Sequence, residues 1–184
     1  PRINYDANGE NGALLLEPQR VNFIPYSEYF SDWILDGNGD GQSVTANYSI
    51  SPEGLQNAYR LQLSFINGTY SRIRKLVTDS YSGAGVFSVY LKTNDGSTKT
   101  ISMRWAGSGA VSKTITSEWQ RFDVSGTAIY TLGQIHELFI GSAEGDSNVV
   151  DLSIYGAMQE AGSYATSYIP NHGTSGGVTR AADS

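Results

Sequence analysis

The sequence contains no cysteine, which excludes disulfides, zinc–thiolate sites, iron–sulfur clusters and thiol nucleophiles. It contains only two histidines, His136 and His172, so a metal site built from several histidines is excluded as well. Charged residues make up 16% of the chain, and the net charge of −6 argues against a nucleic-acid partner. No segment approaches the ~20 apolar residues of a membrane helix. The start, Pro1–Ile3, has no features of a signal peptide, so we expect a mature or excised domain.

Glycine and tyrosine are abundant instead, with 21 and 12 residues among 184. This mixture is typical of an extracellular β protein with many turns, and the length fits one domain. Alternating or short apolar runs between turn residues predict about ten strands. The clearest of them cover residues 13–17, 59–65, 71–77, 86–92, 100–105, 110–115, 119–124, 137–140 and 149–155.

These strands predict an all-β fold, a jelly-roll β-sandwich of two antiparallel sheets. The one helical candidate is a turn at residues 26–33, where Ser27 can act as a cap and Tyr26, Tyr29, Phe30 and Trp33 would share a face. Asn94–Gly96 predicts a hairpin turn. We assign residues 1–170 to a single module and the glycine-rich residues 171–184 to a linker or tail.

Period-two alternation assigns the sides of the strands. The apolar sets, such as Phe87, Val89 and Leu91, are predicted to form the core between the sheets, and Trp105 is in phase with its strand's apolar set. The opposite sets form an outer face, and if their strands are neighbours this face is basic and aromatic. It can bind sugars, because rings stack on pyranose C–H faces and cations bond hydroxyls or carboxylates, or it can be an ordinary solvated face. Its residues are Tyr90, Lys92, Arg104, Arg72 and Arg74.

The sharpest local pattern is Asp36-Gly37-Asn38-Gly39-Asp40-Gly41. It matches the first half of a calcium loop, with oxygen ligands from Asp36, Asn38 and Asp40. The twelfth position holds Asn47 in place of glutamate, so the segment is no EF-hand. Two interpretations stay open, an irregular site for a structural calcium ion or a plain turn between strands.

Catalytic patterns are scarce. No Gly-x-Ser-x-Gly elbow lies between a strand and a helix, and no phosphate-binding loop occurs. His136 begins a strand, and the carboxylates Glu17, Glu118, Glu137 and Asp151 share no pattern that pairs them. We therefore predict that the module is not an enzyme.

The sequence carries Leu14–Phe23 followed by Tyr26–Phe30 and Trp33, Ser51–Gly54 followed by Ala58–Leu61, and Tyr155–Pro170 followed by Val178–Asp183. These stretches resemble a domain of bacteriophage tail and structural proteins. Two further stretches, Phe87–Lys92 and Thr116–Phe122, resemble the jelly-roll carbohydrate-binding modules attached to xylanases and other glycanases. The resemblance covers nearly the whole chain.

This resemblance implies a non-catalytic module that binds a polysaccharide on a concave sheet face or at the loop end, often with a supporting calcium ion. It implies an extracellular or virion-surface location, with flanking domains of a larger protein and no membrane insertion. Tyr90 and Lys92 take the outward positions of the matching strand, with tyrosine in place of a frequent tryptophan. An arginine-rich face favours an acidic polysaccharide. The alternatives are a structural or assembly module of a phage appendage or adhesin that binds no sugar, and a polysaccharide lyase on the same scaffold.

Overall fold

The computed structural model describes residues 2–4, 12–37, 41–65, 70–78, 83–105, 108–128, 135–143 and 146–183. Within these residues the chain is built from strands, with a single short 3-10 turn, η1 (Phe30–Asp32). No helix among them is long and apolar enough to cross a membrane. The strands are β1 (Arg2–Asn4), β2 (Ala13–Leu15), β3 (Arg20–Asn22), β4 (Ile34–Gly37), β5 (Ser43–Ser49), β6 (Ala58–Ser64), β7 (Tyr70–Thr78), β8 (Gly83–Thr93), β9 (Lys99–Trp105), β10 (Val111–Ile115), β11 (Gln120–Ala128), β12 (Ile135–Ala143), β13 (Val149–Ala161) and β14 (Val178–Arg180).

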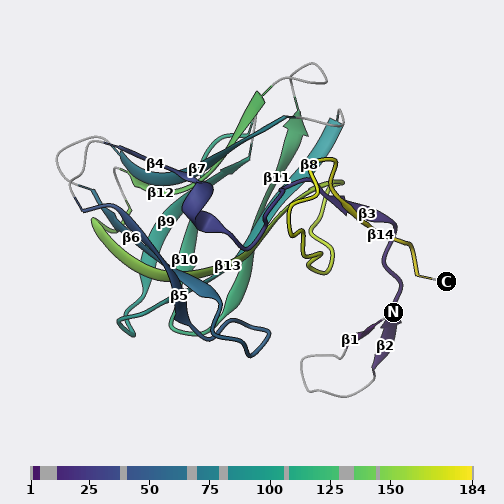
Figure 1. Cartoon of the computed structure of the whole chain (residues 1–184), viewed down its shortest axis with the longest axis horizontal. Coiled ribbons are helices and arrows are strands. Elements are labelled where there is room, and N and C mark those ends of the chain that lie inside the picture. Colours follow the sequence, from purple (N-terminus) through teal and green to yellow (C-terminus); the bar gives the residue numbers. More distant parts are fainter. Residues whose placement is uncertain are drawn as a thin grey trace.

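Two five-stranded antiparallel sheets pack face to face (Figure 1). One has the strand order β10-β9-β12-β7-β4, and we call it the open sheet. The other has the order β11-β8-β13-β6-β5, and we call it the covered sheet. Successive strands repeatedly change sheets, as β6 to β7 and β8 to β9 do, which is the jelly-roll pattern. The predicted all-β jelly-roll sandwich is confirmed.

The core lies between the two sheets, and the alternation of the sequence places its residues correctly. Phe87, Val89 and Leu91 of β8 are fully buried, and Trp105 ends the fully buried set of β9. Burial of one such side chain contributes about 1.5–3 kcal/mol. The hydrophobic effect therefore fixes which face of each strand points inward.

The covered sheet carries a third layer on its outer face. This layer is a C-terminal strap, residues 162–183, which joins the N-terminal segment where β14 pairs with β3 (Figure 1). Thr166 N–H of the strap donates to the Glu160 carboxylate of β13 at 2.8 Å. The N-terminal segment lies along the edge of β13 that β8 does not occupy, where Phe23 N–H donates to Gln159 O at 2.9 Å. Tyr155 of β13 packs against Tyr168 of the strap, with ring centroids 5.8 Å apart, and is consequently buried.

This strap corrects the predicted boundary at Pro170. Asn171 is fully buried, and β14 forms ladder pairs with β3. Arg180 makes an ion pair with Glu17 at 2.9 Å. Residues 171–183 thus belong to the folded module instead of a linker.

Two local predictions are wrong. The Asn94–Gly96 turn joins β8 to β9, which lie in different sheets, so it is a crossover between the sheets and not a hairpin. In residues 26–33 the aromatic side chains do not share a face. Phe30 and Trp33 enter the core, whereas Tyr26 and Tyr29 are 50% and 46% exposed. Ser27 caps no helix, since its hydroxyl bonds Tyr168 and Asn171 of the strap.

Candidate functional site

The outer face of the open sheet carries a groove of about 230 Å³. It is formed by residues of β7, β9 and β12 and by Ala110, which directly precedes β10. No strap covers this face among the described residues, in contrast to the covered sheet. Its lining consists of Tyr70, Arg72, Ser102, Arg104, Ala110, Phe139, Gly141 and Ser142.

Strand register brings these residues together. In β12, Leu138 and Ile140 are buried in the core, so Phe139 and Gly141 point outward. Phe139 lies opposite Arg104 of β9 on one side and Arg74 of β7 on the other. The pleat therefore sets an aromatic ring between two guanidinium-bearing positions.

Gly141 keeps the next row open. It lies between Arg72 of β7 and Ser102 of β9. A Cβ at this position would lie 2.6 Å from the Cβ of Arg72 and 2.9 Å from the carbonyl oxygen of Ser71. Because these contacts are too close for any side chain, only glycine allows Arg72 to sit here without displacing the strand.

Arg72 is held rigidly at the groove. Its Nη2 lies 2.8 Å from the Asp36 carboxylate of β4, and its Nη1 lies 2.6 Å from the Glu137 carboxylate of β12. The guanidinium also lies over the rings of Tyr70, at 4.4 Å, and Phe139, at 5.2 Å. Two carboxylates and two rings thus fix one cation, which in turn orients both rings.

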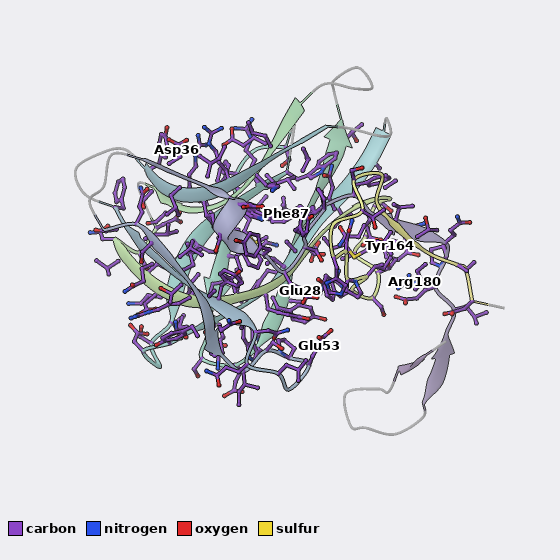
Figure 2. The ribbon with its side chains drawn as sticks, viewed as in Figure 1. Glu28, Asp36, Glu53, Phe87, Tyr164 and Arg180 are labelled. Atoms are coloured by element: carbon purple, nitrogen blue, oxygen red, sulfur yellow. The ribbon has the colours of Figure 1, made fainter. Side chains whose placement is uncertain are left out.

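Asp36 is shared by two arginines, since Arg74 Nε lies 3.0 Å from the same oxygen that Arg72 contacts. The hydrogen bond from Arg72 holds the pKa of the Asp36 carboxyl below its ordinary value, against the opposing effect of burial. Figure 2 shows Asp36 at the edge of the molecule, on β4, far from Arg180 of the strap. A calcium ion there would compete with two guanidinium groups. Asn38 and Asp40 lie outside the described residues, so the calcium site stays a prediction.

The lowered pKa of Asp36 makes a prediction about acid. The folded state holds the Asp36 proton less tightly than the unfolded chain does, so the ion pair stabilises the fold above about pH 4 and this contribution is lost as the pH falls through the lowered pKa. Asp36→Asn should therefore destabilise the domain more at pH 6 than at pH 2.5. Urea unfolding at both pH values measures this, with the exposed Glu118→Gln as control. An equal loss at both pH values would contradict it.

The five residues predicted from sequence divide between the two sheets. Arg72, Arg74 and Arg104 lie on the open sheet, and Arg72 and Arg104 line the groove. Tyr90 and Lys92 belong to β8 of the covered sheet, so the expectation that their strand neighbours that of Arg104 is wrong.

Both residues of β8 have partners on the side of the covered sheet and its strap. Tyr90 packs edge-on against Tyr168 of the strap, with ring centroids 6.4 Å apart, and beneath the Arg121 guanidinium at 5.7 Å. Lys92 Nζ lies 5.3 Å from the ring centre of Trp119. These contacts make Tyr90 part of the packing between sheet and strap.

Sequence reasoning missed the aromatic residues of the groove, Phe139 and Tyr70. The signal for Phe139 was present, because Leu138-Phe139-Ile140-Gly141 alternates between apolar core positions and outward positions. No such signal exists for Tyr70. It is the first residue of its strand, so no alternating pattern before it assigns its side chain to a face. The sequence also did not show which strands lie in the same sheet.

Comparison with solved structures identifies this arrangement of sheets. A family 11 carbohydrate-binding module from Clostridium thermocellum, in complex with a β-1,3-1,4-mixed-linked tetrasaccharide, matches with a TM-score of 0.52 at 15% identity, over 82% of this chain and 99% of that one. The module TmCBM61, in complex with β-1,4-galactotriose, matches with a TM-score of 0.50 at 16% identity, over 75% of this chain and 97% of that one. The fold is that of the carbohydrate-binding modules.

The same fold occurs in a phage protein. The enzymatically active domain of tailspike protein 4 of bacteriophage CBA120 matches with a TM-score of 0.51 at 15% identity, over 75% of this chain. The chain spans 21% of that tailspike chain. No protein-family model and no curated protein sequence matches the chain. At these identities the comparisons establish the carbohydrate-binding-module fold, which is the fold that the resemblance implied, and they name no ligand for this chain.

Proposed function

We propose that this domain is a non-catalytic carbohydrate-binding module whose polysaccharide lies in the groove of the open sheet. The observation that carries the proposal is the groove itself, in which two aromatic rings and two arginines meet on a sheet face that no strap covers. The carbohydrate-binding-module fold supports it. The parent is a phage tail-type or secreted multidomain protein, and the module acts outside the cell or on the virion surface.

The chemistry of the groove suits a sugar ring. Phe139 and Tyr70 offer apolar surfaces for the C–H faces of a pyranose, and Tyr70 is 39% exposed. Arg104 and Ser102 bring hydrogen-bonding groups to the same groove, where hydroxyl groups of the sugar would lie. The chain needs no nucleophile or acid–base pair for this role.

The charges of the face favour a neutral glycan over an acidic one. Asp36 and Glu137 offset the guanidinium charges of Arg72 and Arg74 through contacts of 2.6–3.0 Å. An acidic polysaccharide would have to approach two carboxylates as well as the arginines. The number of arginines in the sequence favoured an acidic ligand. Because Arg72 and Arg74 are paired with carboxylates, that argument for an acidic ligand loses most of its weight. Binding to a neutral glycan should change little between low and high salt, because no net charge is neutralised.

Affinity electrophoresis against neutral, uronic and sulfated polysaccharides tests the proposal. Phe139→Ala and Arg104→Ala should each weaken retention about tenfold, the scale of one lost stacking or charged contact. Lys92→Ala is the matched control, since Lys92 lies on the opposite sheet, and it should leave retention unchanged. If Phe139→Ala keeps retention and Lys92→Ala loses it, the site lies on the covered sheet and the proposal is contradicted.

The second candidate is an assembly module of a phage appendage, which the tailspike match favours. It predicts a folded domain that no polysaccharide in the panel retains and that forms a stable oligomer in solution. Sedimentation velocity on the same sample separates the two functions.

A further inference from the structure

A second hollow, also of about 230 Å³, lies away from the groove and shares no residue with it. It is built from four segments that are distant in sequence, namely the loop before η1, β5, the start of β6, and the strap. We call it the tyrosine hollow. The residues that matter below are Tyr26, Glu28, Tyr29, Asn47, Asn57 and Tyr59.

Both described non-glycine residues with a left-handed backbone line this hollow. Tyr26 and Asn47 each have φ of 54°. For a residue as bulky as tyrosine this conformation is a genuine outlier, and strain of this kind gathers at functional sites. Gly173 of the strap packs against the Tyr26 ring so closely that a Cβ there would lie 2.6 Å from Cζ. The strained backbone and the strap together hold the Tyr26 side chain half-exposed at the rim.

The aromatic part of the hollow forms a corner. The rings of Tyr29 and Tyr59 meet edge to face, with an interplanar angle of 89° and centroids 6.2 Å apart. Tyr59 is 5% exposed and serves as the base, while Tyr29 is 46% exposed and offers its surface to a ligand.

The polar part of the hollow combines acceptors and donors, with the Glu28 carboxylate, the amides of Asn47 and Asn57, and the strap residues Asn171 and His172. The side-chain oxygen of Asn57 is buried and has no hydrogen-bond partner among the described residues. Glu28 contributes a carboxylate that accepts a hydrogen bond from the Tyr168 hydroxyl of the strap at 3.1 Å, and Figure 2 shows Glu28 near the strap. No lysine or arginine lines the hollow. A buried, unpartnered acceptor costs free energy in the free protein. The Asn57 residue as a whole is only partly buried, so a small rotation of its amide would bring this oxygen to the surface of the hollow, where a ligand O–H group could bond it.

We propose that the tyrosine hollow is a second saccharide site, which takes one neutral sugar unit by stacking on Tyr29 and by donating a hydroxyl to the Asn57 oxygen. The site is independent of the groove on the open sheet. With both occupied, one domain would hold a glycan at two points, or two chains at once, and its apparent affinity for a polymer would exceed that for either fragment.

The test uses the full, ¹⁵N-labelled chain and NMR titration with four probes, namely methyl β-glucoside, methyl β-galactoside, methyl α-mannoside and N-acetylglucosamine. At least one should shift the side-chain amide signals of Asn47 and Asn57 in a saturable way. Tyr29→Ala and Asn57→Ala should each weaken that binding about tenfold. Tyr164→Ala, which removes a tyrosine of similar exposure (54%) that does not line the hollow, should leave it unchanged.

Two further measurements distinguish a binding site from residues that serve only the stability of the fold. Asn57→Ala should leave the melting temperature unchanged or raised, because it removes an unpartnered acceptor, and Phe139→Ala in the groove should leave these shifts intact. A fifth titration, with tetramethylammonium, tests whether the hollow binds a cation instead of a sugar. The proposal is overturned if none of the four sugars shifts the signals of the hollow, or if tetramethylammonium shifts them and the sugars do not. It is also overturned if Phe139→Ala abolishes the shifts or if Asn57→Ala lowers the melting temperature markedly.

Discussion

Removal of residues 171–184 should lower the melting temperature of the domain by about 10 °C or more. A loss of about 5 kcal/mol in the free energy of unfolding has an effect of this size in a chain of this length. Asn171 lies at the centre of the strap and is fully buried. Its Nδ2 donates to Asn22 O and Thr174 O, its Oδ1 accepts from two strap amides, and its own N–H donates to the Ser27 hydroxyl at 2.9 Å. Truncation leaves the groups of Asn22 and Ser27 without these partners.

The truncation also removes contacts further along the strap. β14 pairs with β3, and Arg180 bonds both Glu17, at 2.9 Å, and the carbonyl oxygen of Ser167, at 3.0 Å. Each buried group left unpaired costs about 1–3 kcal/mol, so several together approach the 5–15 kcal/mol of a typical domain.

Thermal unfolding followed by circular dichroism measures the effect. Asn171→Ala should reproduce a large part of it in the full chain, whereas Thr179→Ala, at an exposed position of β14, should change little. A truncated chain that melts with the full one would restore the prediction that residues 171–184 are a linker.

The strap shows why glycine content alone does not identify a linker. Gly173, Gly176 and Gly177 are typical of a flexible linker. In the structure Gly177 has φ of 89°, and a Cβ there would lie 2.5 Å from the Val21 side chain. Gly173 approaches Tyr26 in the same way. Glycine here allows close approach and a left-handed backbone, and a single sequence does not distinguish that use from flexibility.

The two faces of each strand could be predicted, but the neighbours of each strand could not. Alternation placed Phe87 and Trp105 in the core because burial acts on one strand at a time. The candidate site depends on which strands lie side by side, and that is decided by long-range pairing. Arg72 and Arg104 therefore meet across β12, whereas Tyr90, which has the same local pattern, lies on the other sheet.

Trp105→Ala should destabilise the domain by about 3–5 kcal/mol, the usual cost of replacing a fully buried tryptophan by alanine. Trp105 is completely buried at the end of β9 and lies opposite Leu138 of β12. Trp119→Ala is the matched control. Its indole is partly exposed, donates one hydrogen bond to Ile50 O at 3.0 Å, and should cost about 1 kcal/mol.

Urea unfolding of both variants measures the difference, and equal losses would contradict the placement of Trp105 in the core. The Trp105 variant has a second consequence, because the cavity it creates lies directly behind the groove. Leu138 and Trp105 face the core where Phe139 and Arg104 face outward, and these two pairs are adjacent in the same strands. A loosened core there should let Phe139 and Arg104 shift, so at a temperature where the variant is still folded its retention on polysaccharide should fall, while Trp119→Ala keeps full retention.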